Sequence, residues 1–396
     1  MIDNLPNGWK IKELKNVGEF IRGVSYNKND LIDNIEEDTD ITLLRANNIQ
    51  DRLFLNDFQF LKNKSVKQKQ LIKYGDILIA MSSGSKDLVG KNVFINKDLK
   101  NYSFGAFCSV FRTNEKNNKK YIAHFFKSKI FKNSLSLNGT NINNLRITEM
   151  ELLNIPIPPL QQQEKIVKVL DLTSNLIEKQ KKLLEKYDLF LKSKFIEMFG
   201  DPITNPMGWE VVKCIDVADC IVPGRDKPKS FTGNIPWITT SDLKDKGIIF
   251  KSKENIGLSQ IEINEVKAKL IPKNSVIFTC VGELGLCSIT NENIIMNQQL
   301  HSFQCRDKIN NIFLMFDISM QKSYMYKMAT STTVPYMNKT TCNNIPTILP
   351  PIELQNKFAS IVKKIETIKE KENQKLKQFE DLHNSMMNKA FKGEIK

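Results

Sequence analysis

The sequence predicts an α+β protein with a pseudo-twofold internal repeat: two similar globular domains separated by two long antiparallel helices that form a coiled coil. Three observations support this prediction. The 396 residues are about twice the usual length of a single domain. Two proline-rich segments each precede a long stretch with helical spacing, and the segments ahead of them also resemble each other. The expected order along the chain is therefore domain, helix, domain, helix.

The repeat is clearest where each domain gives way to its helix. Aligning Pro159 with Pro351 gives an offset of 192 residues, and the drift of this offset to 200 elsewhere is expected if loops differ in length. The corresponding segments are NIPIPPLQQQEKIVKVL at 154–170 with NIPTILPPIELQNKFASIV at 344–362, LPNGWKIKELKNVGEF at 5–20 with NPMGWEVVKCIDVADC at 205–220, ITLLRANNI at 41–49 with IPWITTSDL at 235–243, and LIKYGDILIAMSSG at 71–84 with LIPKNSVIFTCVG at 270–282.

These correspondences set the expected boundaries and elements. The four parts are a first domain at 1–155, a first helix at 156–200, a second domain at 201–348 and a second helix at 349–396. KYGDILIAMSS and KNSVIFTCVG each follow a turn signal and are rich in apolar residues, as buried strands are. Helical spacing at 121–135 and 310–328 predicts a helix in each domain.

Each long helix has a proline start and a heptad-like apolar stripe. Proline pairs at 158–159 and 350–351 fix the helix starts, and Gly200 and Pro202 follow the last apolar residue of the first copy. The first helix spans about 39 residues, or ~58 Å. Gln180 and Glu372 place a polar residue at equivalent positions of the two stripes. Because the second domain follows one helix and precedes the other, pairing of the stripes requires antiparallel helices.

Composition indicates a polyanionic partner. Lys and Arg number 58 against 44 Asp and Glu, which gives a formal charge of +14 and a pI near 9.2. The alternative is a lysine-rich surface that serves only for solvation. Seven cysteines without a C-x-x-C motif suggest small buried side chains in a reducing cytoplasm instead of a zinc site. An apolar run of ~18 residues is missing from the sequence, so we expect a cytoplasmic protein without a membrane span.

Two unlike basic domains held apart by helices suit duplex DNA, whose half-sites recur about every 34–36 Å. Because the domains differ in sequence, they would read two different half-sites, which predicts an asymmetric, bipartite target. Two alternatives belong to other classes: a coiled-coil adaptor with incidental basic charge, and an enzyme with an unfamiliar site. The adaptor gives no reason for two unlike basic domains, and the sequence shows no convergent set of catalytic groups.

The order of variable domain, P-P-L-x-x-Q helix, variable domain and P-P-I-x-x-Q helix, with Gly-Trp near each domain start, resembles the DNA-specificity subunit of Type I restriction-modification enzymes. The resemblance covers essentially the whole chain. The second helix start departs from the first, with IPTILPP in place of IPIPP and Asn356 in place of Glu164. This departure suggests a slightly different docking of partners on the second helix.

The resemblance implies a non-catalytic subunit. Its domains would be target-recognition domains that read the major groove, and its helices would set the spacer. Two modification subunits would bind S-adenosylmethionine and methylate adenine, while restriction subunits would use ATP and Mg²⁺ to translocate and cut. This chain itself would need no cofactor and no metal. In agreement, the sequence lacks an Asn-Pro-Pro-Tyr/Phe tetrapeptide and a phosphate-binding G-x-x-x-x-G-K-S/T loop.

Candidate DNA contacts are Arg, Lys, Asn, Ser and Thr residues on loops, because these types bond to base edges and phosphates. In the first domain they are Arg45, Asn47, Asn48, Ser82, Ser83, Ser85, Lys86, Thr140, Asn141, Asn143 and Asn144. In the second they are Arg225, Lys227, Thr239, Thr240, Ser241, Thr332, Thr333, Asn338 and Lys339. The alternative for each residue is an ordinary turn or helix cap. Trp9, Trp209 and the three histidines are expected to be structural.

Overall fold

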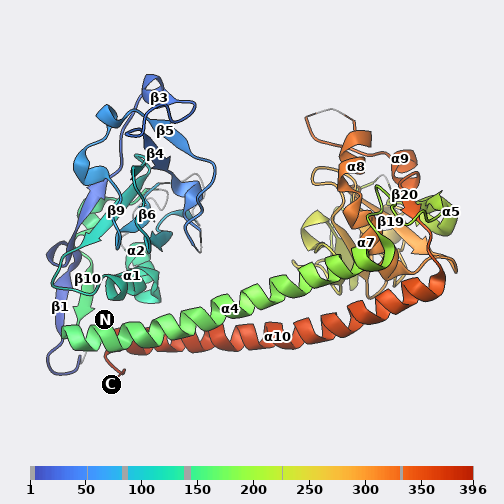
Figure 1. Ribbon diagram of the computed structural model, residues 1–396. Coiled ribbons are helices and arrows are strands. Elements are labelled where there is room, and N and C mark those ends of the chain that lie inside the picture. The colour runs from blue at the N-terminus through green and yellow to red at the C-terminus, as the bar shows by residue number, and fades with distance from the viewer. Residues whose placement is uncertain are drawn as a thin grey trace. The chain divides into compact units, whose positions relative to one another are not determined.

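The computed structural model describes residues 5–50, 52–82, 88–137, 144–224, 226–330 and 333–395. The chain divides into two compact units. Unit 1 comprises Met1–Lys181 with Lys375–Lys396, and unit 2 comprises Lys182–Gln374. Each unit therefore contains one globular part together with a segment of each long helix, and Figure 1 labels some of the elements of both.

Unit 1 contains two four-stranded sheets and a two-stranded one. The first sheet is antiparallel, in the order β2 (Gly18–Arg22), β9 (Cys108–Thr113), β6 (Ile77–Ala80) and β7 (Asn92–Phe94). The second has the order β3 (Leu31–Ile32), β5 (Gln59–Leu61), β4 (Ile41–Leu44) and β8 (Tyr102–Phe104), with β4 and β8 parallel. Strand β1 (Lys10–Glu13) pairs with β10 (Asn154–Ile157) just before the first long helix.

The helices of unit 1 include α1 (Lys119–Lys127), α2 (Lys129–Leu137) and α3 (Ile147–Met150). The helical spacing predicted over 121–135 is confirmed, but the helix is divided into α1 and α2 because Ser128 is extended. The Ser128 hydroxyl accepts a hydrogen bond from the Phe131 N–H at 3.2 Å, so it starts the next helix. Short 3-10 helices are η1 (Leu14–Asn16), η2 (Lys28–Asp30), η3 (Ala46–Asn48), η4 (Asn63–Ser65) and η5 (Gln68–Gln70).

Unit 2 contains sheets of five, three and two strands. The largest has the order β12 (Ala218–Ile221), β19 (Leu300–Cys305), β16 (Val276–Thr279), β17 (Cys287–Thr290) and β14 (Gly247–Ile249). The second has the order β15 (Gly257–Leu258), β13 (Ile235–Ile238) and β18 (Ile295–Met296), and the third pairs β11 (Val211–Lys213) with β20 (Pro346–Ile348). Its helices include α5 (Cys214–Val217), α6 (Gln260–Glu265), α7 (Asn311–Met320), α8 (Lys322–Met328), α9 (Lys339–Asn343) and the 3-10 helix η7 (Thr240–Asp242).

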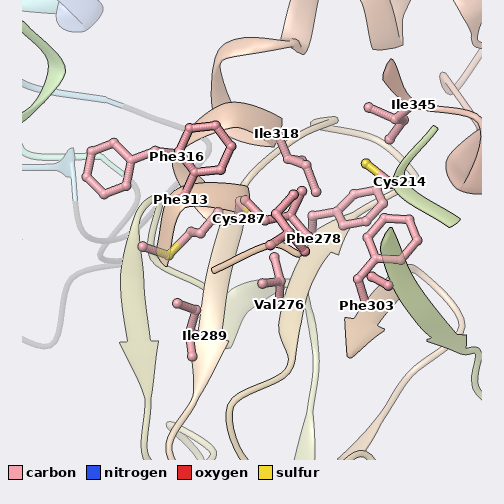
Figure 2. Close-up of a cluster of buried hydrophobic side chains, with 14 of the residues drawn as sticks. Cys214, Val276, Phe278, Cys287, Ile289, Phe303, Phe313, Phe316, Ile318 and Ile345 are labelled. Carbon is pink, nitrogen blue, oxygen red and sulfur yellow. The ribbon is translucent and has the colours of Figure 1, made fainter. Parts of the chain in front are cut away.

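One hydrophobic core cluster of unit 2 includes side chains of α7, of the five-stranded sheet and of the long helices. Figure 2 shows Phe313 and Phe316 of α7 beside Val276, Phe278 and other buried side chains of the sheet. The helical spacing predicted over 310–328 is also confirmed, and this segment is likewise divided, at Gln321, into α7 and α8. Both predicted buried strands are confirmed, since β6 and β16 are buried along their whole length.

The two units repeat one plan. The antiparallel series β2, β9, β6, β7 corresponds to β12, β19, β16, β17, and the parallel pair β4 and β8 corresponds to β13 and β18. The turns before β6 and β16 contain Gly75 and Asn274, which both have positive φ angles. The internal repeat and the α+β class predicted from the sequence are thus confirmed.

The long helices are α4 (Leu160–Phe199) and α10 (Ile352–Lys392), and they pair antiparallel within each unit. In unit 1 the Thr173 hydroxyl lies 2.7 Å from His383 Nδ1. In unit 2 Lys369 Nζ lies 2.7 Å from Asp188 Oδ1, and the Phe195 ring contacts that of Phe358 at 5.4 Å. Residue numbers rise along α4 while those of the partners fall, as antiparallel helices require.

The P-P-L/I-x-x-Q signature joins each helix to its globular part. Gln163 is buried, and its Oε1 accepts from the Asn118 N–H at 2.8 Å while its Nε2 donates to the Pro158 carbonyl at 3.0 Å. In unit 2, Gln355 Oε1 accepts from the Asn310 N–H at 2.8 Å and its Nε2 donates to the Pro350 carbonyl at 2.8 Å.

Asn118 and Asn310 are the N-caps of α1 and α7. Each glutamine therefore ties the start of a long helix to the start of a domain helix through backbone atoms.

The Gly-Trp segments lie at the opposite ends of the long helices. The Trp209 indole N–H donates to the Phe199 carbonyl at 2.9 Å, and Gly200 lies against Pro206. In unit 1, Gly393 lies against Pro6 and Trp9. Both tryptophans pack against the cores of their units, which confirms the expected structural role.

Candidate nucleic-acid interface

The first polar loop of unit 1 follows β4 and is shaped by Asn48. Its Oδ1 accepts from the Arg45 N–H at 2.8 Å, and its Nδ2 donates to the carbonyls of Phe54 and Asn56 at 2.9 and 2.7 Å. Asn48 is fully buried, so its hydrogen-bonding groups are used inside the protein. We therefore correct its expected role from a DNA contact to a residue that holds the loop.

Arg45 and Asn47 of this loop converge on one carboxylate. Arg45 Nη2 lies 2.9 Å from Asp57 Oδ2, and Asn47 Nδ2 donates to the same oxygen at 2.5 Å. Asp57 has a φ of 52°, in the left-handed region that Asp tolerates better than most residues. A guanidinium has five N–H donors, so Arg45 keeps donors for a ligand while Asp57 holds its orientation.

The second and third candidate loops of unit 1 lie side by side. Ser82 forms an antiparallel bridge with Asn144, and the Leu145 N–H donates to the Met81 carbonyl at 2.8 Å. Asn144 is exposed and Ser82 is half-buried. The remaining candidates of these loops lie outside the described residues: Ser83, Ser85, Lys86, Thr140, Asn141 and Asn143.

In unit 2 the loop after β13 has the same backbone shape as the loop after β4. The Thr239 N–H donates to Asp242 Oδ2 at 2.7 Å, as the Arg45 N–H does to Asn48. Thr239 Oγ1 also lies 2.8 Å from Ser241 Oγ, and Ser241 is exposed while Thr240 is half-buried. Hydroxyl groups therefore stand where unit 1 has a guanidinium and an amide.

The second pair of loops in unit 2 also matches its counterpart. Val281 forms an antiparallel bridge with Tyr336, and the Gly282 N–H donates to the Pro335 carbonyl at 2.9 Å. Thr333, Asn338 and Lys339 are exposed. Thr332 lies outside the described residues.

Asn338 also has a structural role as the N-cap of α9. Its Oδ1 accepts from the Thr341 N–H at 2.9 Å. Its carboxamide NH₂ group is the part left to meet a ligand.

The basic loop at 223–229 is held by a residue of the strand-end turn after β18. Gln298 Nε2 donates to the carbonyls of Gly224 and Asp226 at 3.0 and 3.3 Å. Lys227 and Lys229 are exposed, as phosphate contacts require. Arg225 lies outside the described residues.

Two further groups of polar residues lie beside the candidate loops or at positions equivalent to candidate residues, and the sequence did not predict them. Arg146 is the N-cap of α3, its side chain is 73% exposed, and it stands 192 positions before the candidate Asn338. The amide-rich turn Asn297, Gln298 and Gln299 follows β18, next to the loop that contains Thr239. The Asn297 N–H donates to the Ile238 carbonyl at 2.9 Å. The repeat offset would have identified Arg146.

The neighbouring side chains of Cys220 and His301 lack the electrostatics of a nucleophilic pair. Cys220 Sγ lies 3.3 Å from His301 Nε2, but burial lowers the pKa of His301 to about 4 and raises the pKa of the Cys220 thiol. A neutral imidazole beside a protonated thiol favours neither a thiolate nor base catalysis. His124 bonds to Asp171 and His383 to Thr173, so both are structural as expected.

Within the described ranges, neither a metal-ligand cluster nor a membrane-spanning helix is found. Groups of three or more His, Cys, Asp or Glu side chains with metal-binding geometry are missing from these residues. The helices described are too short or too polar to cross a membrane. The described loops of each unit offer hydrogen-bond donors and acceptors, and Lys227, Lys229 and Lys339 of unit 2 are exposed.

One family model matches both halves of the chain. It is described as the Type I restriction modification DNA specificity domain, and it matches residues 6–186 and 206–378. The specificity subunit of the Type I restriction enzyme StySPI from Salmonella potsdam is 30% identical over 425 residues, covering 99% of this chain and 90% of that protein. The EcoKI specificity subunit of Escherichia coli K12 is 29% identical over 422 residues, with the same coverage.

Solved structures share the fold at lower identity. A structure concerned with complex assembly and conformational transition of the type I R-M system has a TM-score of 0.57 and 18% identity, covering 98% of this chain and 99% of that one. The S subunit of a Type I restriction-modification system from M. genitalium has a TM-score of 0.52 and 13% identity, covering 98% of both chains. At these identities the likeness concerns the fold.

Proposed function

Because this chain belongs to the family of Type I restriction modification DNA specificity proteins, we propose that it reads a bipartite, asymmetric DNA sequence and directs adenine methylation by partner subunits. Unit 1 reads one half-site and unit 2 the other. The adaptor alternative gives no account of the family match or of the polar loops at equivalent places in both units.

The observation that carries this proposal is that the same backbone positions have different polar side chains in the two units. The loops after β4 and β13 have the same hydrogen-bonded shape, yet Arg45 stands in one where Thr239 stands in the other. The loop pairs bridged at Ser82 and at Val281 likewise differ in residue type. Loops with the same backbone shape but different hydrogen-bonding side chains suit two domains that read different base sequences.

Within this proposal the described candidates have two kinds of role. Arg45, Asn47, Ser82 and Asn144 in unit 1, and Thr239, Thr240, Ser241, Thr333 and Asn338 in unit 2, contact base edges. Lys227 and Lys339 contact phosphates, because a flexible ammonium suits a charge contact better than base discrimination.

Catalysis is assigned to other subunits. Two modification subunits bind S-adenosylmethionine and transfer the methyl group, and restriction subunits use ATP and Mg²⁺. This chain contributes recognition without a cofactor, and it works on DNA in the cytoplasm.

The experiment is to express the chain with its cognate modification subunits in a host without other adenine methylation and to map methylated adenines across the genome. We expect a split motif with a gap of constant length. A matched culture that lacks this chain controls for the partner subunits alone. Methylation without a split motif, or methylation in the control, would contradict the proposal.

The length of the paired helices is expected to set the gap between the half-sites. Seven residues inserted after Lys181 in α4, together with seven after Gln374 in α10, preserve the heptad and lengthen the pair by about 10 Å. At ~3.4 Å per base pair the gap should grow by about three base pairs, with both half-sites unchanged. A changed half-site with an unchanged gap would refute the spacer role.

A further inference from the structure

An exposed aromatic side chain lies between the candidate loops of unit 1. Phe107 is 70% exposed and sits in the turn that joins β8 to β9. On one side of this turn, the Gly105 N–H donates to the Leu44 carbonyl at 2.9 Å, directly before Arg45. On the other side, the Phe107 carbonyl accepts from the Ser82 N–H at 3.3 Å. The backbone therefore fixes Phe107 between the Arg45 loop and the Ser82 loop.

The same backbone position in unit 2 carries a polar side chain. Gln299 follows β18 and precedes β19 as Phe107 follows β8 and precedes β9, and its carbonyl accepts from the Cys280 N–H at 3.0 Å. Gln299 is also exposed. One unit thus presents an aromatic ring where the other presents an amide, on the same turn.

Packing within the unit does not explain the aromatic residue. Most of the Phe107 side chain is open to water, and the preceding Ala106 is exposed as well. Single exposed apolar residues are ordinary on protein surfaces. Phe107 differs from them by its position, since its turn is bonded to both loops that carry polar candidates.

We propose that Phe107 is a specificity-determining residue, which packs against the C5-methyl group of a thymine in the major groove of the half-site read by unit 1. This inference rests on the proposed function and deepens it. The thymine methyl is the apolar group that the major groove displays, and aromatic or methyl side chains contact it in direct readout. The neighbouring Arg45, Asn47 and Ser82 supply the polar contacts on either side.

The test uses the full chain in complex with its modification subunits and a duplex that carries the mapped target. Each thymine of the two half-sites is replaced singly by deoxyuridine, which lacks the methyl group, and binding is measured by titration. We expect the wild-type complex to lose about threefold to fivefold in affinity at one thymine of one half-site. Phe107→Ala should lose a similar factor in affinity for the DNA with thymine, and replacing that thymine by deoxyuridine should cause no further loss. Phe107→Leu should keep part of the difference in affinity between thymine and deoxyuridine DNA.

Ile35→Ala is the matched control. Ile35 is 52% exposed and lies in the loop before β4, at the other end of that strand from Arg45. This variant should bind and respond to deoxyuridine as wild type does.

Three outcomes would overturn the inference. In the first, Phe107→Ala keeps the full response to the methyl group. In the second, it weakens binding equally at every thymine and deoxyuridine, as a wedge between base steps would. In the third, the response lies in the half-site read by unit 2. If a split motif is methylated but substitution of Phe107 does not change the response of binding to the thymine methyl group, this inference alone is refuted. The absence of any split motif would refute the proposed function.

Discussion

The two units are alike where a domain meets a long helix and unlike at the proposed reading loops. At the helix starts, Gln163 and Gln355 bond to the same kind of backbone groups with nearly the same distances. At the loops, Arg45 is replaced by Thr239 and Phe107 by Gln299. The shared architecture is therefore stabilised by glutamine contacts to backbone groups, whereas the exposed side chains on the loops differ between the units.

The cores of the units differ in chemistry as well. In unit 2 the rings of Phe195 and Phe199 from α4 contact Phe313 of α7 and Phe358 of α10. In unit 1 the positions that correspond to Phe195 and Phe358 are Met387 and Ile166, which are buried aliphatic side chains. At these two positions the helix pair therefore has aromatic rings in unit 2 and aliphatic side chains in unit 1, while Phe391 of α10 contacts the rings of Tyr121 and Phe125 in unit 1 at 5.3 and 5.5 Å.

The largest expected effect tests the aromatic anchor. Phe195→Ala removes a fully buried ring that lies 5.0 to 6.1 Å from four others, so the free energy of unfolding of unit 2 should fall by about 4 kcal/mol. Hydrogen exchange resolved by peptide should show faster exchange in unit 2 while unit 1 keeps its protection.

Phe190→Ala serves as the control for this variant, because Phe190 lies on the same helix but is 47% exposed. It should change stability by less than about 1 kcal/mol. Equal loss of protection in both units after Phe195→Ala would contradict the assignment of the ring to one core.

A smaller, symmetric effect is expected at the two glutamines. Gln163→Ala and Gln355→Ala each leave a partly buried backbone N–H and a buried proline carbonyl without their partner, so each should cost about 2 kcal/mol in its own unit. Chemical denaturation followed by hydrogen exchange would separate the two. Gln161→Ala, at an exposed position of α4, should leave stability unchanged. Unequal costs would break the equivalence of the two helix starts.

At the reading loops the expected effect is on binding. Arg45→Ala should weaken binding to the half-site of unit 1 by about 1–3 kcal/mol if the guanidinium pairs with a guanine. The variant should also relax the base preference at that position, as measured by competition with single-base variants of the target. Lys15→Ala, beside β1, is a control that removes a positive charge elsewhere in the unit. Unchanged methylation of the half-site by the Arg45 variant would count against its role.

A pH dependence of stability is expected from Asp317 in unit 2. Burial raises the pKa of Asp317 from 3.8 to about 8, and the corresponding position in unit 1 is Phe125. Between these two pH values Asp317 is protonated in the folded state and ionised in the unfolded state. The free energy of unfolding of unit 2 should therefore fall as pH rises through this window, by at most about 1.4 kcal/mol per pH unit.

Asp317→Asn should remove the contribution of Asp317 to this slope, because an amide does not titrate. Denaturant midpoints measured at several pH values would show it. A slope that is the same in wild type and in Asp317→Asn would mean that another group is responsible.

Much of the fold could be predicted from the sequence, because the features that indicate it lie in short segments and occur in both halves of the chain. Proline pairs, apolar stripes and the 192-residue offset located both long helices and the repeat. The interruption of the domain helices at Ser128 and Gln321 was missed, because the apolar spacing continues across both breaks. Sequence periodicity reports neither the hydrogen bond from the Phe131 N–H to the Ser128 hydroxyl nor that from Gln321 Nε2 to the Pro346 carbonyl.

The candidate site was less predictable for a physical reason. Asn47 and Asn48 are adjacent and chemically identical, yet one is exposed and the other fully buried. The residue types indicated a loop able to contact DNA. Only the fold shows that the Asn48 amide makes its hydrogen bonds within the loop itself. Phe107 was missed because an aromatic residue next to a strand ordinarily indicates core.

The glutamine joint has a consequence for how such proteins diverge. Since Gln163 and Gln355 recognise main-chain N–H and carbonyl groups, the joint places few demands on which side chains the attached domain carries. A domain could accumulate substitutions, or be replaced by a relative with the same backbone path, without a compensating change in the helix. Evolution of new target sequences is thereby decoupled from the preservation of assembly.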